Sequence, residues 1–181
     1  MSDEQKSTAN RATFPVGVLM EQQRSSGVNR WSVPTWEAVA VIAGEHLAAA
    51  GDGGSPVRDG EGNPQRLWPG FEVTLFRDSA DAYWYNLVGK HPSLFVICRA
   101  GETGDLEPFL VTANYDEAGA YMEADDTVYA VPIPPEIYRW LERFVIEHNV
   151  PQEPEKKRRR VKWAGDSAFE RRPGGDPQRR H

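Results

Sequence analysis

Short apolar runs recur along the chain, and their alternation with polar residues predicts strands that are buried on one or both faces. The strands expected on this basis span residues 14–20, 36–42, 71–76, 93–99, 107–113 and 127–131. We expect the first two to pair with each other. The fourth is the clearest strand of the set, and the turn chemistry at 101–105 indicates that it forms a hairpin with the fifth.

Two later segments have the pattern of helices. Asn114 followed three residues later by Glu117 resembles a capping box, and it predicts a short helix of about ten residues. Pro134 and Pro135 suit the first turn of a final helix, because the first N–H groups of a helix need no partner within it. The apolar positions of that helix recur at helical spacing and should cover the sheet: Ile137, Trp140, Leu141, Phe144, Val145 and His148.

Three consecutive aromatic residues, Tyr83, Trp84 and Tyr85, follow a possible helix N-cap at Asp78. In a strand, Tyr83 and Tyr85 would share one face and Trp84 would take the other. If one face belongs to the core, at least one large ring is left to pack under a loop or to meet a partner. Core packing and a partner surface both remain open for this group.

These elements predict an α+β fold: a mostly antiparallel sheet of about six short strands, one short inserted helix and one C-terminal amphipathic helix on the sheet. Regular β-α-β alternation is absent, which argues against a doubly wound fold. We expect a disordered lead at 1–12, a single domain at 13–150 with a flexible Gly-rich loop at 51–65, and a disordered basic tail at 151–181. The Gly-rich loop lacks the Gly-Lys-Ser/Thr ending of a phosphate loop and carries acidic residues.

Charge is distributed unevenly between the domain and the tail. The chain has 21 basic and 27 acidic residues, yet residues 151–181 contain 10 basic and 5 acidic ones. An acidic domain repels nucleic acid, so the tail alone could attract an anionic partner or the acidic face of its own domain. The tail residues expected to bind a partner are Lys156, Lys157, Arg158, Arg159, Arg160, Lys162 and Trp163.

No catalytic or metal-binding motif is evident in the sequence. The lone Cys98 lies in an apolar run, which favours a buried structural thiol over a reactive one. The four histidines are isolated from one another, and no G-x-S-x-G sequence occurs. We therefore expect a protein that is not an enzyme and holds no cofactor. The N-terminus has no signal-peptide pattern and no run is long enough to span a membrane, so a cytoplasmic location is expected.

Several short stretches resemble the proteobacterial family called domain of unknown function 3305. They are Pro15–Val18 with Trp31 and Trp36, the segments 83–87, 95–99, 110–113 and 132–135, and Trp140, Phe144 and His148 with the basic run that follows. Together they cover most of residues 14–162. The insertion at 44–65 is longer than the resemblance predicts, and the region after Trp163 has no counterpart in it.

Members of that family are typically encoded beside genes for a molybdenum-dependent formate dehydrogenase and its chaperones. The resemblance therefore implies an accessory role in the assembly or maturation of that enzyme, by contact with one of its subunits or with its chaperone. Two alternatives remain: binding or transfer of the molybdenum cofactor, and binding of RNA or another anion through the tail. Some relatives carry a nucleotidyltransferase label, but such enzymes place a Gly-rich loop after the first strand, and 15–18 offers one glycine.

Overall fold

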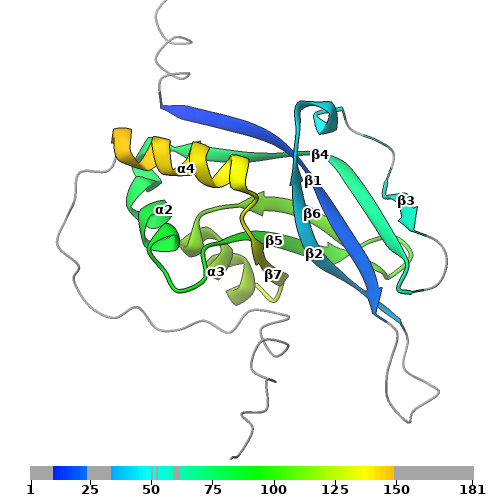
Figure 1. The fold of residues 1–181 in the computed structure, drawn as a ribbon. Helices are drawn as coiled ribbons and strands as arrows, with labels where there is room; N and C mark the ends of the chain where they lie inside the picture. The colour runs from blue at the N-terminus through cyan, green and yellow to red at the C-terminus, as the bar shows by residue number, and fades with distance from the viewer. Residues whose placement is uncertain (1–9, 24–33, 50, 52, 59–61, 149–181) are drawn as a thin grey trace, which may run out of the picture.

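The computed structural model describes residues 10–23, 34–49, 51, 53–58 and 62–148 (Figure 1). The expectations for residues 1–9 and for the tail at 151–181 lie outside the described residues. The elements, in chain order, are β1 (Arg11–Gln23), β2 (Thr35–Ala43), the 3-10 turn η1 (Glu45–Leu47), β3 (Ser55–Arg58), β4 (Gln65–Phe76), the 3-10 turn η2 (Arg77–Ser79), α2 (Ala80–Leu87), β5 (Ser93–Ala100), β6 (Leu106–Thr112), α3 (Tyr115–Glu123), β7 (Thr127–Pro132) and α4 (Pro135–His148).

The described strands form two antiparallel sheets. The first sheet has the order β2-β1-β4-β3, and the second has the order β6-β5-β7. The predicted pairing of β1 with β2 and the predicted β5–β6 hairpin are both confirmed. The α+β class is confirmed as well, with the difference that seven described strands divide between two sheets where a single sheet of about six strands was expected.

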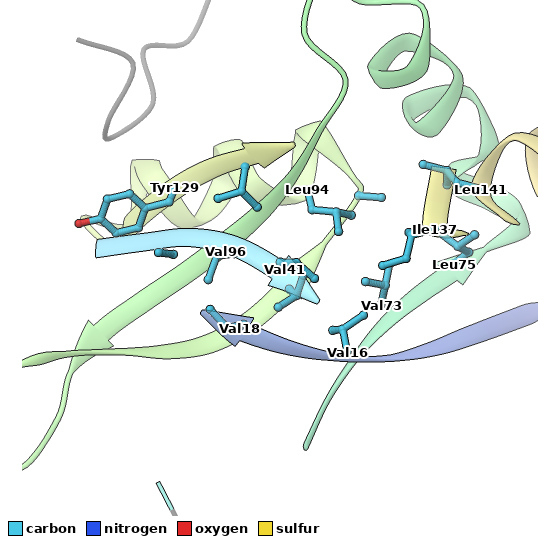
Figure 2. Packing of buried hydrophobic residues seen from close by; sticks show 14 of the residues in the cluster. Val16, Val18, Val41, Val73, Leu75, Leu94, Val96, Tyr129, Ile137 and Leu141 are labelled. Atoms are coloured by element: carbon cyan, nitrogen blue, oxygen red, sulfur yellow. The ribbon is translucent and has the colours of Figure 1, made fainter. Parts of the chain in front are cut away.

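The main core lies between the two sheets (Figure 2). Because side chains alternate along a strand, Val16 and Val18 of β1 point from the first sheet toward Leu94 and Val96 of β5. Helix α4 closes one end of this layer with the predicted apolar stripe, in which Ile137, Leu141, Phe144 and Val145 are buried. The stripe predicted from the sequence is therefore the face that joins the core.

A second, smaller core lies on the opposite face of the second sheet. Phe95 and Ile97 of β5 and Val128 of β7 pack there with Ala118 of α3. The predicted cap of α3 is confirmed, since the side-chain oxygen of Asn114 accepts hydrogen bonds from the backbone N–H groups of Asp116 and Glu117. The two cores therefore lie on opposite faces of the second sheet, with α3 on its outer face.

Tyr83, Trp84 and Tyr85 lie in helix α2, so the alternation of faces considered for a strand does not apply to them. A helix does follow the possible N-cap at Asp78, but it begins at Ala80. Asp78 lies in η2, and Ser79 at the N-cap of α2 makes no side-chain capping bond. Instead, the carboxylate of Asp81 in the first turn accepts a hydrogen bond from the N–H of Ala82 at 2.8 Å. The helical position changes which of the three rings can reach the surface.

The ends of the predicted domain and the Gly-rich segment also differ from expectation. Strand β1 begins at Arg11, two residues before the expected domain start. Residues 55–58 of the expected loop form β3, which pairs with β4. Gly54 precedes β3 and lies against the indole of Trp68, so closely that a Cβ at Gly54 would overlap the indole nitrogen. A glycine is therefore required here by a close approach of the backbone to a ring.

Candidate protein-binding surfaces

Tyr83 belongs to the core and not to the surface. Its side chain is 1% exposed, and its ring packs edge-on against Phe144 with centroids 6.1 Å apart. The phenolic oxygen accepts a hydrogen bond from the N–H of Phe76 at 3.0 Å, which ties α2 to the end of β4. Burial raises the pKa of Tyr83. Of the two interpretations left open for this residue, core packing is the one that the structure shows.

Trp84 and Tyr85 are half-buried and form an edge-to-face pair with ring centroids 5.1 Å apart. One turn further along, Val88 directly follows the helix, and its side chain is 57% exposed. Residues three and four apart share one helix face, so these three side chains make one apolar area. We call Trp84, Tyr85 and Val88 the α2 surface. Val88 was missed in the sequence because a single valine beside a Gly-Lys turn carries no signal.

Asn86 fixes the position of α2 and is itself buried. Its amide nitrogen donates to the backbone carbonyls of Ser93, at 2.7 Å, and Ala113, at 2.9 Å. Its amide oxygen accepts from the N–H of Ser93 at 3.0 Å. One side chain therefore joins the end of α2 to the start of β5 and to the residue after β6. The α2 surface sits on a helix held by this network and by the ring of Tyr83.

A second surface was not predicted and centres on Phe109. The β5–β6 ladder shifts between Ile97 opposite Leu110 and Cys98 opposite Pro108, so Phe109 is the extra residue of a β-bulge. Pro108 has no N–H to give to the ladder, which suits a bulge on an edge strand. The ring of Phe109 is 49% exposed.

Arg99 holds the Phe109 ring from one side. Its guanidinium carbon lies 4.0 Å from the centroid of Phe109 and 5.7 Å from that of Tyr121. The same guanidinium donates two hydrogen bonds to the carboxylate of Asp126, from Nε at 2.9 Å and from Nη2 at 2.8 Å. These hydrogen bonds lower the pKa of Asp126 and raise that of Arg99. We call Arg99, Phe109, Tyr121 and Asp126 the Phe109 surface.

The chain next to the Phe109 surface is acidic. Glu107 lies opposite Arg99 in the ladder, and Glu123 and Asp125 are exposed at the end of α3. Asp125 has a φ of 66°, a left-handed conformation that Asp adopts more readily than most residues and that turns the chain out of α3 into β7. Because Arg99 and Asp126 neutralise each other, the surroundings of Phe109 are net negative.

Two side chains of potentially reactive type, those of Cys98 and His148, are held by the fold. The side chain of Cys98 is 1% exposed, and burial raises the pKa of its thiol to about 12, which confirms the predicted buried thiol. His148 stacks on Phe144 with ring centroids 4.3 Å apart, and its Nδ1 lies 2.8 Å from the carbonyl oxygen of Phe144. Within the described ranges, no three His, Cys, Asp or Glu side chains lie together in a way that could hold a metal ion.

The basic residues expected to bind a partner lie outside the described part of the chain: Lys156, Lys157, Arg158, Arg159, Arg160, Lys162 and Trp163. Of the expected partner-binding residues, the structure therefore places the three aromatic ones alone. It separates them into a core residue, Tyr83, and two surface residues, Trp84 and Tyr85.

A family model described as a protein of unknown function, DUF3305, matches residues 15–160. The chain belongs to this family, as its resemblance in sequence implied. No curated protein and no solved structure matches the chain. None of the helices in the described residues is long and apolar enough to cross a membrane.

Proposed function

We propose that this protein is a non-enzymatic accessory factor that binds a subunit of a molybdenum-dependent formate dehydrogenase, or the chaperone of that subunit, in the cytoplasm during assembly of the enzyme. The formate dehydrogenase part of this proposal rests on the neighbouring genes that the family resemblance implies. Contact with another protein follows from the surface of the molecule itself.

The α2 surface is the observation that carries the proposal. Tyr and Trp are enriched at the centres of protein interfaces, because each buries a large apolar area with little loss of side-chain freedom. Here both rings are already packed against each other, and the neighbouring Val88 is well exposed. The helix beneath them is fixed by the buried amide of Asn86, so little ordering is required on binding.

The first test is affinity purification of tagged full-length protein from its native host grown under conditions that induce formate dehydrogenase. We expect a subunit of that enzyme or its chaperone to be recovered and identified by mass spectrometry. Deletion of the gene should lower formate dehydrogenase activity. Recovery of neither protein, together with unchanged activity in the deletion strain, would contradict the proposal. Recovery of RNA in their place would support binding through the basic tail.

A matched pair of variants tests whether the α2 surface makes the contact. Val88→Arg places a charge in the apolar area, and we expect recovery of the partner to fall at least tenfold. Val57→Arg is the control, because Val57 has the same 57% exposure but lies on β3 of the first sheet and not beside α2. Equal loss in both variants, or in neither, would show that the α2 surface does not bind the partner.

A further inference from the structure

The Phe109 surface combines an exposed ring with an excess of negative charge. A half-exposed phenylalanine in contact with Arg99 and Tyr121 has the composition of a protein interface, in which aromatic residues and arginine are enriched. Glu107, Glu123 and Asp125 add negative charges. Arg99, the basic residue of the surface, is already paired with Asp126. An occupant of this area should therefore carry positive charge and at least one apolar or aromatic side chain.

We propose that the Phe109 surface is the docking site of this chain's own basic segment, residues 156–163. The segment contains six basic residues and a tryptophan, at Lys156, Lys157, Arg158, Arg159, Arg160, Lys162 and Trp163. Arginine pairs with carboxylates through two parallel hydrogen bonds and stacks on aromatic faces, and the surface offers both kinds of partner. The pairing of Arg99 with Asp126 and Phe109 shows that this geometry already exists at the site.

The charge balance of the chain supports the same occupant. The described residues contain 8 basic and 17 acidic side chains, whereas residues 149–181 contain 10 basic and 5 acidic ones. The two parts therefore attract each other. The basic segment 156–163 could bind any of several acidic areas of the domain. Among these, the area around Phe109 adds a ring on which Trp163 or an arginine can stack.

The connecting chain is long enough for this contact. Residue 161 lies thirteen residues beyond His148, the last residue of α4, and thirteen extended residues span up to about 45 Å. A unit of about 120 residues has a diameter of about 35 Å. A short tether also keeps the segment at an effective concentration on the order of 1 mM, so that even a weak contact is substantially occupied.

Docking of this kind would regulate binding by the tail. While the segment covers the Phe109 surface, its cations are partly neutralised, and an anionic or acidic partner must first displace it. The segment would be released by salt, because exposed charges are screened over a few ångströms at high ionic strength. This inference concerns contacts within one chain and does not depend on the formate dehydrogenase role.

Paramagnetic relaxation in the full-length protein tests the contact. Cys98 is buried, with a thiol pKa of about 12, so a thiol-reactive spin label attached to a Val161→Cys variant will react at the introduced position alone. We expect the amide signals of Glu107, Phe109, Leu110 and residues 121–126 to lose more than half their intensity in low salt. In 0.5 M salt they should recover, and dilution should leave the low-salt result unchanged.

A charge and ring double variant, Phe109→Ser with Glu123→Lys, should restore the intensities in low salt. The matched control, Ile42→Ser with Glu72→Lys, changes one exposed apolar and one exposed acidic residue of the first sheet, and it should leave the broadening as before. If the double variant loses its dispersed spectrum, the single change Glu123→Lys replaces it, with a loss of at least half the broadening expected.

Three results would overturn the proposal. Unbroadened signals around Phe109 would show that the segment does not dock there. Broadening centred on another acidic area would assign a different site. Broadening that disappears on dilution would show that the segment binds a second copy and not its own domain.

Discussion

The buried amide of Asn86 gives the sharpest test of how the fold is held together. Replacement by alanine removes three hydrogen bonds at once, and it leaves the carbonyls of Ser93 and Ala113 and the N–H of Ser93 without this partner. A buried polar group left unpaired costs about 1–3 kcal/mol. Partial relaxation and entry of water reduce the total, so we expect Asn86→Ala to lower the free energy of unfolding by about 3–5 kcal/mol.

The near-isosteric change Asn86→Asp isolates the polar contribution from the loss of volume. The protonated carboxyl could donate to one carbonyl, whereas the ionised carboxylate would face two carbonyl oxygens. Its pKa in the folded state should therefore rise above the value of about 3.9 in the unfolded chain. A raised pKa means that stability is fully present below pH ~4 and is lost as the pH rises through the folded pKa. The difference in free energy of unfolding between Asn86→Asp and wild type should therefore grow between pH 4 and pH 7.

Urea unfolding followed by tryptophan fluorescence measures both effects at matched pH. Asn114→Ala is the control, because it removes an amide that caps α3 at the surface and should cost about 1 kcal/mol. If Asn86→Ala lowers the free energy of unfolding by no more than Asn114→Ala, the buried amide does not hold the fold in this way. A difference in free energy of unfolding between Asn86→Asp and wild type that does not change with pH would have the same meaning.

Three further predictions concern single positions. Gly119→Ala should stabilise the protein by about 0.5–1 kcal/mol, because a Cβ inside α3 meets nothing within 4 Å; a lower melting temperature would contradict this. Gly54→Ala should destabilise by about 1–3 kcal/mol and shift the tryptophan emission, since the added methyl overlaps Trp68; an unchanged spectrum would contradict it. Burial raises the pKa of Cys98 to about 12 and also raises that of Tyr129, so the free energy of unfolding should be constant from pH 7 to about 8.5 and fall above it; urea midpoints that do not change up to pH 11 would contradict this.

Much of the fold could be predicted wherever burial of one face makes apolar residues recur at strand or helix spacing. Strands β1 and β5 carry continuous or alternating apolar residues because both face the core, and α4 carries a stripe because one of its sides does. The Asn114 cap was also visible, although the capping box is completed indirectly. The carboxylate of Glu117 accepts from the hydroxyl of Thr112 at 2.6 Å, and that hydroxyl oxygen accepts from the N–H of Asn114.

The possible N-cap at Asp78 was the only sign of helix α2 in the sequence analysis, and strand β3 was not predicted. Three consecutive aromatic residues favour a strand by propensity, and the helix is selected because Ala80, Tyr83 and Asn86 all meet the core from one side. All four residues of β3 are exposed, so the strand has no apolar pattern to reveal it. Its presence follows from pairing with β4, which is a tertiary contact. Local sequence thus failed where tertiary contacts decide the conformation.

The bulge at Phe109 shows why the unpredicted surface is tied to the core. Pro108 lies opposite Cys98, which points into the main core, and Leu110 lies opposite Ile97, which points into the second core under α3. Two positions two residues apart in a regular strand share one face, so only an extra residue lets Pro108 and Leu110 enter opposite layers. That residue is Phe109, and it is left half exposed.

The exposed ring is therefore a consequence of filling both cores, and Arg99 is the side chain that covers part of it. Two changes at this position should therefore differ in their effect. Phe109→Ser keeps the bulge and should change the free energy of unfolding by no more than about 1 kcal/mol. Deletion of Phe109 restores regular alternation and forces Pro108 or Leu110 out of its core, so it should cost several times as much. Equal effects of the two changes would show that the surface and the core are specified independently.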